Sequence, residues 1–472
     1  MIRGAIRFID ERTGSVPLLR KALRYAFPDH WTFLFGEIAL YSFVVLVGTG
    51  VFLTLFFEPS LARTTYDGVY DPLRGTEVSL AFDSAMRISF DVNGGLLMRQ
   101  THHWAALVFV AAISVHLMRI FFTGAFRRPR DLNYYIGLTM LVLALVEGFV
   151  GYSMVDDLLS GMGLAIAYAT TLAIPLIGGD VGFLLWGGEF PGAPDFISRL
   201  FIAHVFILPV IIGALIALHL ALIAVPHHAQ FRGGGATERN VVGTPMWPGY
   251  ALRSAGLLFA TAGFLFLLGG LVQINPIWQW GPFELEDGTN GVQPDWYMGW
   301  LIGALRIMPP IEPSLFGYTI FPNPFFGALV VPSVVFGLLY MWPWIERRVT
   351  GDRAAHNLLD RPRDNPWRTA VGVAMFTFII LIFLAASADR VFVSFGIDYG
   401  TQVWIFRLAV FVLPAIAYVL TKRICEELQE TDWHPLRGPP GPAVRRTSGG
   451  GYERVSAARA GRPRGRSGAP RR

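Results

Sequence analysis

Five histidines lie inside long apolar stretches of the sequence, where an imidazole that faced lipid would be costly. His102, His103 and His116 share one stretch, and His204 and His219 share a later one. At 100° per residue, His102 and His116 lie about 40° from alignment and roughly 21 Å apart along a helix, whereas His103 and His116 point about 140° apart. His204 and His219 lie about 60° from alignment, with a rise of roughly 22 Å. Helical phase therefore selects His102 over His103.

Two neighbouring antiparallel helices with these histidines would form two bis-imidazole sites stacked across a membrane. His102 and His204 make the site near the outer face, and His116 and His219 make the site near the inner face. A tetrapyrrole iron between two neutral imidazoles is six-coordinate and transfers electrons. Cys425 is the only cysteine, which excludes a cysteine-ligated iron–sulfur cluster and a C-x-x-C-H haem attachment. The sequence therefore predicts two non-covalent b-type haems; the alternative is packing histidines bonded to backbone carbonyls.

Glycines repeat at nearly the same spacing in two other apolar stretches. Gly36 and Gly50 are fourteen residues apart, and so are Gly137 and Gly151. Glycine in a helix costs about 1 kcal/mol relative to alanine, and it lets a bulky group approach the backbone. We expect the edges of the two macrocycles to lie against these glycines. The alternative is ordinary small-residue packing between helices.

Two arginines flank the histidines of the first stretch. Arg99 lies three residues before His102, and Arg119 lies three residues after His116. Each falls on the helix face that carries the predicted ligands, just beyond a haem, where the propionates need a cation. The alternative is that both arginines snorkel at helix ends.

The elements that must position these residues are transmembrane helices. The chain has 472 residues, of which 53% are hydrophobic and 15% charged. Eight apolar runs are long enough to cross a bilayer core of about 30 Å. They lie near 33–57, 102–122, 135–155, 201–225, 251–273, 325–344, 370–388 and 403–420. With both termini inside, thirty Lys and Arg residues fall in inner segments and six in outer ones, which is the positive-inside pattern.

This pattern predicts an all-α polytopic membrane protein with four parts. No cleavable signal peptide is visible, and the net charge of +5 comes mostly from the C-terminal tail, so we expect no nucleic-acid partner. The predicted parts are an amphipathic cytoplasmic N-terminus (1–32), a four-helix bundle for two haems (33–235), a domain with four further transmembrane helices (236–425) and a basic disordered tail (426–472).

One motif, Pro294-Asp295-Trp296-Tyr297, gives these features a family context. It resembles the Pro-Glu-Trp-Tyr motif at the outer quinol-oxidation site of cytochrome b in the cytochrome bc family, whose respiratory members are quinol–cytochrome c reductases. The paired histidines, both glycine pairs and the Arg-x-x-His that begins at Arg99 also lie where that family has them. The resemblance covers Trp31 to Glu426. Gly151-Tyr152, followed by the segment 156–161, is similar to bacterial branches that often use menaquinol.

The resemblance implies a respiratory enzyme subunit in a bacterial cell membrane. Quinol would be oxidised at the outer face, where Asp295 accepts a proton and Tyr152, Gly163 and Tyr297 line the pocket. One electron would pass to a Rieske [2Fe–2S] protein and the other through both haems to quinone at the inner face, coupled to proton translocation. The implied partners are the Rieske protein, a c-type cytochrome, quinone, membrane lipid and a second copy of the chain.

At the inner face the sequence departs from the family. Pro248-x-Tyr250-x-x-Arg253 is similar to the family's inner site, but Ser254 stands where many members have a proton-carrying aspartate. We hypothesise that His227 and His228 substitute as proton donors.

Other interpretations of the same residues remain. Glu147, inside the third apolar run, is either a proton relay or a bonded structural acid. For the whole chain the alternatives are a dihaem anchor of a dehydrogenase and a haem-free proton-coupled transporter. The anchor predicts fewer spans and no outer Pro-Asp-Trp-Tyr motif, and the transporter predicts a colourless protein.

Overall fold

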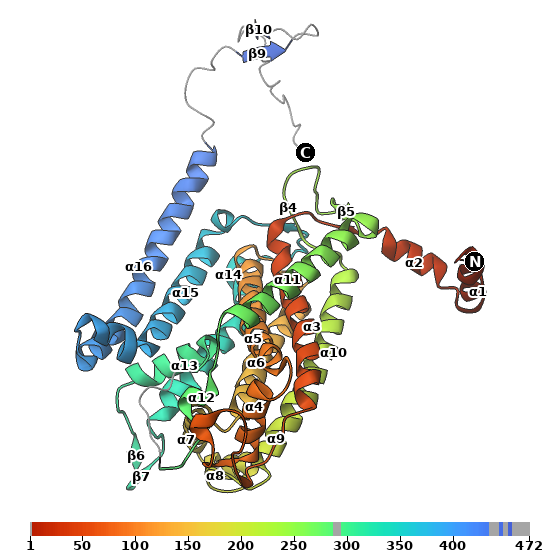
Figure 1. Ribbon diagram of the computed structural model, residues 1–472. Coiled ribbons are helices and arrows are strands. Elements are labelled where there is room, and N and C mark those ends of the chain that lie inside the picture. Colours follow the sequence, from red (N-terminus) through yellow and green to blue (C-terminus); the bar gives the residue numbers. More distant parts are fainter. Residues whose placement is uncertain (1, 287–293, 434–442, 447–451, 456–472) are drawn as a thin grey trace.

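The fold is a bundle of long helices, shown in Figure 1 for a computed structural model that describes all residues except 1, 287–293, 434–442, 447–451 and 456–472. In that part of the chain, eight helices are long and apolar enough to cross a membrane, which confirms the predicted number of spans. They are η1–α3 (Trp31–Phe33, Leu34–Thr54), α5 (Gly95–Phe122), α6 (Asp131–Ser153), α9–η3–α10 (Phe196–Ile202, Ala203–Ile207, Leu208–Ala224), η4–α11 (Met246–Tyr250, Ala251–Leu271), η5–α14 (Phe325–Val330, Val331–Thr350), α15 (Pro366–Ala386) and α16 (Tyr399–Trp433).

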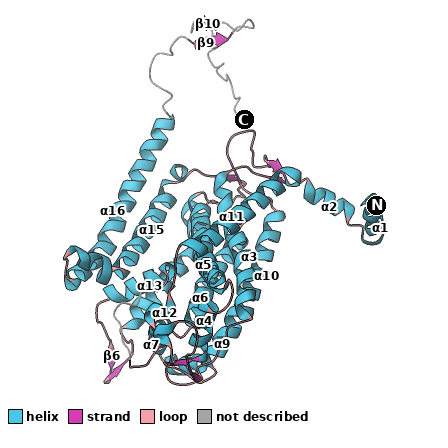
Figure 2. Ribbon diagram, in the orientation of Figure 1, coloured by secondary structure: helices cyan, strands magenta, loops and turns pink. Residues whose placement is uncertain are grey.

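Shorter elements connect these spans. The remaining helices are α1 (Ile2–Thr13), α2 (Val16–Leu23), η2 (Asp71–Leu73), α4 (Leu80–Phe90), α7 (Leu158–Leu172), α8 (Gly178–Trp186), α12 (Ile277–Trp280), α13 (Trp296–Ile307), η6 (Pro362–Asp364), η7 (Ala388–Phe392) and η8 (Val393–Phe395). The strands form antiparallel pairs β1 (Ala26–Phe27) with β5 (Thr244–Pro245), β2 (Arg63–Thr65) with β3 (Glu77–Ser79), β6 (Ser314–Leu315) with β7 (Tyr318–Thr319) and β9 (Ala443–Arg446) with β10 (Tyr452–Val455), and a parallel pair β4 (Gln230–Phe231) with β8 (Leu358–Leu359). Figure 2 shows how little strand the molecule contains.

Local sequence signals explain where α15 begins. Proline stands in its first turn, where its missing N–H costs no hydrogen bond. Asn365 caps α15 by accepting a hydrogen bond from the Arg368 amide at 3.1 Å. Large apolar side chains such as Phe259 and Phe411 are 74% and 76% exposed. Such surfaces suit contact with lipid, since a helix satisfies its own backbone there.

The core lies mainly between α3, α5 and α6, with α14 closing one side. Leu138, Phe126 and Trp342 are buried in its largest apolar cluster. A separate cluster joins α13, α15 and α16 around Ile382 and Phe406. Trp342 of α14 thus packs into the cluster of the first four spans, while α13, α15 and α16 share a second cluster.

The two ends of the bundle carry different elements. One end, which we call the inner end, carries α2, β4, β5 and the end of α16; the outer end carries α4, α7, α8, β6 and β7 (Figure 1). The described N-terminus and the end of α16 thus lie at the same end, as an even number of spans requires. α16 continues to Trp433, so it extends past residue 425, where we expected the C-terminal domain to end.

Candidate functional site

The outer histidines, His102 in α5 and His204 in η3, face each other across the bundle. Their ring centroids are 6.0 Å apart, and the ring planes lie at 79°. A metal with imidazole nitrogens at roughly 2 Å on each side places two opposed ring centroids roughly 6 Å apart. The spacing therefore suits an iron atom between the two rings.

Hydrogen bonds at Nδ1 set the orientation of both outer rings. Thr49 donates its hydroxyl proton to the Val45 carbonyl at 2.7 Å, so its oxygen accepts from His102 Nδ1–H at 2.9 Å. His204 Nδ1 lies 3.0 Å from Glu147 Oε1 and 3.2 Å from the Glu147 carbonyl oxygen. With the proton on Nδ1, each ring offers the lone pair of Nε2 as a ligand. The contact between Glu147 and His204 favours the interpretation of Glu147 as a bonded structural acid over that of a proton relay.

The inner histidines, His116 in α5 and His219 in α10, have a different environment. The two rings are close enough for a positive charge on one to repel a positive charge on the other. Both Nδ1 atoms are buried, and neither has a hydrogen-bond partner in the described part of the chain. The backbone of Asn133 is near His219 but does not complete a hydrogen bond. Among the described residues, no hydrogen bond to Nδ1 orients the inner rings as it does the outer ones.

Each of the four predicted glycines lies against the imidazole at its own level. A methyl group added to the glycine would lie 3.1 Å from His116 Cε1 at Gly36, 3.2 Å from His102 Cε1 at Gly50, 3.5 Å from His219 Cε1 at Gly137, and in overlap with the His204 ring at Gly151. We expected macrocycle edges at these glycines, and the structure places histidine rings there. The glycines thus make the space in which the rings stand, because a larger residue would push them toward the bundle axis.

A π-helical turn reconciles the two histidine spacings. His102 and His116 are fourteen residues apart in a continuous α-helix, whereas His204 and His219 are fifteen apart. The π-helical segment η3 contains His204 and absorbs one extra residue on the way to His219. The fifteen-residue spacing then behaves as fourteen, about 40° from alignment rather than about 60°. The sequence analysis, which assumed a regular α-helix, missed this adjustment.

Arg99 and Arg119 each present buried nitrogen atoms without a partner. Arg99 Nη2 donates to the Asn275 carbonyl at 3.0 Å, but its Nε has no partner among the described residues. Arg119 stacks over Phe33 at 4.2 Å, and its Nε and Nη2 are likewise unpaired there. Unpaired guanidinium groups inside a protein are costly, so an anionic group such as a haem propionate fits both positions.

Asp295 makes a contact that the sequence analysis did not predict. Its Oδ1 lies 2.8 Å from His103 Nε2, and both side chains are mostly buried. His103 points away from the haem-ligand face, as helical phase requires, and reaches the segment before α13. No local pattern links residues so far apart in sequence. The available signal was that an intramembrane histidine is a functional candidate by default.

Aromatic side chains surround this contact. Tyr297 is buried, and its hydroxyl lies 2.5 Å from where a side chain at Gly148 would begin. Burial and the neighbouring Asp295 hold the pKa of Tyr297 well above its ordinary value. The Tyr152 hydroxyl is buried without a partner in the described residues, and Gly163 lies against the Tyr152 ring. The structure thus brings Tyr152, Tyr297 and Asp295 into one region at the outer end.

The turn after α6 packs against the segment 281–284. Asp156 adopts a left-handed backbone conformation (φ 59°), and its carbonyl accepts from the Phe283 amide at 3.0 Å. Asp157 caps α7 in a capping box with Ser160. Burial raises the pKa of Asp156 to about 6. These contacts fix the mouth of the outer region.

The predicted inner-site residues are only partly gathered. His228 lies near Tyr25 and Phe27, whereas His227 is exposed and stacks on Tyr25 with ring centroids 4.9 Å apart. Arg253 is exposed and pairs with Asp29 at 2.9 Å. The three predicted residues therefore do not converge on one point. Glu37, which the sequence analysis did not select, lies beside Ser254.

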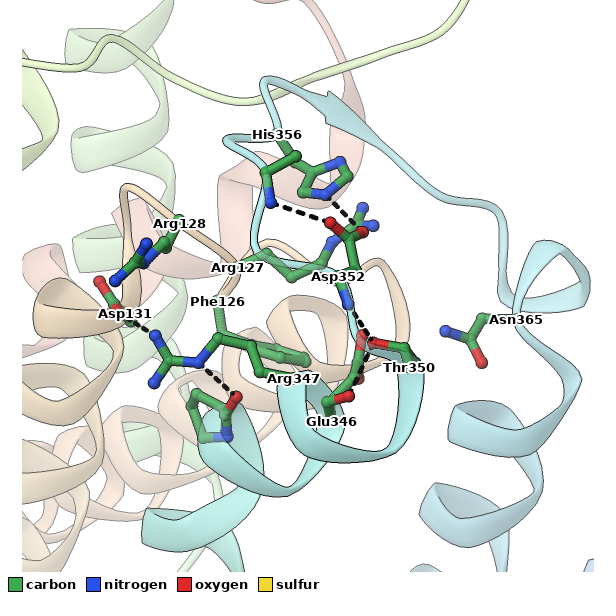
Figure 3. A pocket seen from close by; sticks show the side chains of 12 residues that line it. Phe126, Arg127, Arg128, Asp131, Glu346, Arg347, Thr350, Asp352, His356 and Asn365 are labelled. Carbon is green, nitrogen blue, oxygen red and sulfur yellow. Dashed lines mark hydrogen bonds and ion pairs between the residues drawn. The ribbon is translucent and has the colours of Figure 1, made fainter.

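A small cavity and a larger one open at the inner end of the described part of the chain. The smaller, of about 60 Å³, is lined by charged side chains already paired with one another, such as Arg347 with Asp131 and His356 with Asp352 (Figure 3). None of the predicted site residues lines this cavity, which is bounded by helix ends and by the loops that connect the spans. The larger, of about 410 Å³, opens beside Phe33.

The donor set at each level suits haem better than a bare metal ion. In the described residues, no group of three or more His, Cys, Asp or Glu side chains comes together as a metal site. Two imidazoles per level would hold an iron atom only in part, and a macrocycle would provide the remaining ligands. The residues present, including the unpaired arginine atoms, fit that group.

Comparisons with known proteins identify similar chains. The family model described as "Cytochrome b(N-terminal)/b6/petB" matches residues 107–282. The chain is 51% identical over 425 residues to the cytochrome bc1 complex cytochrome b subunit of Mycobacterium tuberculosis, covering 90% of this chain and 77% of that one. It is 48% identical over 424 residues to the subunit so named from Corynebacterium diphtheriae, covering 90% and 78%.

A solved structure shares the fold. A chain of a hyperthermophilic respiratory complex III aligns with a TM-score of 0.66 at 20% identity, covering 90% of this chain and 100% of that chain. At that identity the likeness concerns the arrangement of helices.

Proposed function

Because the chain belongs to the family of cytochrome b subunits of cytochrome bc1 complexes, we propose that it holds two bis-histidine b-type haems and oxidises quinol at its outer end. It is a component of a quinol–cytochrome c oxidoreductase and an integral membrane protein. The haem ligands are His102 with His204 and His116 with His219. Bound there, the two haems supply one-electron transfer between the ends of the bundle.

The observation that carries this proposal is the outer histidine pair. Its ring centroids stand 6.0 Å apart, and both Nδ1 atoms are engaged by acceptors on neighbouring helices. Packing histidines would need no such pair of matched tautomers. The engagement of Nδ1 leaves Nε2 of each ring for iron, as in metal sites whose ligands are oriented by a second hydrogen bond.

At the outer end, the side chains handle protons and position the quinol. Asp295 is the base that accepts a proton from the quinol hydroxyl, and His103 holds its carboxylate at 2.8 Å. Tyr152, Tyr297 and Gly163 shape the pocket, whose buried tyrosines exclude water. One quinol loses two electrons and two protons, with a Rieske [2Fe–2S] protein and the outer haem as the two electron acceptors.

At the inner end, quinone is reduced near His228 and Tyr250, whereas Arg253 pairs with Asp29. We further propose that the inner end faces the cytoplasm of a bacterial cell membrane, in agreement with the sequence's thirty-to-six distribution of Lys and Arg. A c-type cytochrome, membrane lipid and a second copy of the chain complete the assembly, and quinol turnover is coupled to proton translocation.

The test is a reduced-minus-oxidised difference spectrum of the complex purified in mild detergent. We expect two b-type components in the wild type and loss of one component in each of His204→Ala and His219→Ala. His103→Ala is the matched control, because it neighbours a ligand without being one, and it should keep both components. A colourless wild type would leave the haem-free transporter as the better interpretation.

A further inference from the structure

An acid from another helix occupies the place where Ser254 replaces the acid common in related sequences. Ser254 Oγ donates to Glu37 Oε2 at 2.7 Å, and Glu37 lies in the first turn of α3 rather than in α11. Tyr250 donates its hydroxyl proton to Glu37 Oε1 at 2.7 Å, and Tyr41 donates to Glu37 Oε2 at 3.2 Å. The carboxyl group missing from α11 is thus supplied from α3.

Among the described residues, Glu37 forms no ion pair with a positively charged side chain. In the described part of the chain, the side chains bonded to Glu37 are the hydroxyls of Tyr41, Tyr250 and Ser254, and no Lys or Arg pairs with it. The nearest arginine on α11, Arg253, pairs with Asp29 instead. On α5, Arg119 lies over Phe33. An unpaired carboxyl group within a membrane span is costly and marks a functional position.

The two histidines first considered as proton donors are poorly placed for that task. Burial, together with Arg119 and Arg130, lowers the pKa of His228 to about 4. His228 is therefore neutral near pH 7 and holds no proton to give as an imidazolium ion. His227 is exposed and stacks on Tyr25. Within the described part of the chain, neither histidine forms a hydrogen bond with Ser254 or Glu37.

Tyr250 joins Glu37 to an aromatic surface. Its ring stacks on Phe27 with centroids 3.9 Å apart and planes at 6°, and the Phe27 ring also lies 5.0 Å from the His228 ring. The hydroxyl of the same residue is bonded to Glu37. Flat aromatic surfaces with a nearby acid suit a quinone ring, which needs stacking partners and a proton source.

We propose that Glu37 supplies one of the two protons taken up when quinone is reduced at the inner end, a proposal that rests on the proposed function. When Glu37 is protonated, the O–H bond of its carboxyl group breaks as the Tyr250 hydroxyl accepts that proton, and Tyr250 passes its own hydroxyl proton to a quinone oxygen, where a new O–H bond forms. The second proton comes from water at the inner face, and two electrons from b-type haem complete the reduction to quinol. Water then returns a proton to Glu37.

The test compares Glu37→Gln with the double variant Glu37→Gln/Ser254→Asp in the purified complex. A short-chain naphthoquinol reduces the b-type absorbance through the outer end, and its reoxidation by the corresponding quinone at the inner end is followed. We expect Glu37→Gln to slow reoxidation about 100-fold and to flatten its pH dependence, with outer-end reduction unchanged. The double variant, which returns a carboxyl group to α11, should recover most of the rate. Glu11→Gln, on exposed α1, is the matched control.

The outcomes separate this inference from the function on which it rests. If the b-type spectrum is absent from the wild type, the proposed function itself fails. If both components are present in Glu37→Gln and reoxidation keeps its wild-type rate, only the role of Glu37 is overturned. Should Glu37→Gln not assemble, Tyr250→Phe keeps the acid and the stacked ring but removes the linking hydroxyl. Slower reoxidation in that variant supports the proposal, and an unchanged rate overturns it.

Discussion

The outer and inner levels of the bundle repeat one arrangement of two histidines and two glycines, yet their surroundings differ. At the outer level, Thr49 and Glu147 bond to the ring nitrogens of the ligands. At the inner level, both Nδ1 atoms are buried without a partner in the described residues. The glycine contacts differ too, since Gly151 would overlap His204 on gaining a side chain, whereas Gly137 leaves 3.5 Å to His219.

The comparison shows that the spacing of the histidines and the side chains around them determine different properties of the two sites. The spacing of the histidines places two sites on the same helices. The side chains near each site then determine which hydrogen bonds its histidines form and which acids lie beside it. The outer ligands are held by hydrogen bonds to Nδ1, one of them from an acid, Glu147. The inner ligands have no such hydrogen bond in the described residues, and the acid at that end, Glu37, is bonded to hydroxyl groups.

The largest effect should come from the glycines. In Gly151→Ala, the new methyl group meets three atoms of the His204 ring, which the Glu147 contact prevents from moving aside. We expect loss of the outer b-type component, and with it nearly all quinol turnover. Gly137→Ala introduces only ordinary van der Waals contact and should keep the inner component. Haem content and the difference spectrum of both variants measure this; equal loss in both would remove the contrast between the levels.

The next effect concerns Asp295. Asp295→Asn removes the proton acceptor, so quinol oxidation should slow by roughly 10²- to 10⁴-fold, with both spectral components intact. His103→Ala keeps the carboxylate but frees it from its 2.8 Å partner, and we expect a smaller loss. Steady-state reduction of cytochrome c by quinol measures both. Loss of haem in Asp295→Asn would show that the residue is structural.

A subtler effect is expected from Glu147→Gln. A carboxylate bonded to Nδ1–H makes the imidazole a more basic ligand and so stabilises ferric iron. Removing the negative charge should raise the reduction potential of the outer component and leave the inner one unchanged, because the inner ligands have no such neighbour in the described residues. Spectroelectrochemical titration of the variant measures both potentials. A shift of equal size at both levels would contradict a local contact.

Much of the fold and part of the site could be predicted from the sequence. The eight spans follow from apolar length, and the selection of His102 over His103 follows from helical phase, which the structure reproduces on α5. The partnership of His103 with Asp295 could not be predicted, because it joins segments far apart in the chain. Glu37 could not be selected for the same reason, because it lies beside Ser254 only when α3 and α11 pack together.

The smallest effects concern pH and act in opposite directions at the two ends. At the outer end, burial raises the pKa of Asp156 from 3.8 to about 6. As pH rises from about 4 to about 6, the unfolded chain releases this proton first, so stability is lost over that interval, by up to about 3 kcal/mol. At the inner end, burial lowers the pKa of His228 from 6.5 to about 4. Here the unfolded chain gains a proton first as pH falls, so stability is lost from about pH 6.5 down to about 4.

Thermal unfolding of the purified complex between pH 4 and 7 tests this opposition. The contributions of Asp156 and His228 partly cancel in the wild type. A variant that lacks one of these groups should therefore show the pH dependence caused by the other group. Asp156→Asn removes the contribution of Asp156 to the pH dependence of stability. The contribution of His228 remains, so the stability of this variant should fall more steeply than that of the wild type as the pH is lowered. His228→Gln should make it fall less steeply. Parallel curves for the wild type and both variants would mean that neither group is buried in its uncharged form, and the contrast between the two ends would then rest on the haem ligands alone.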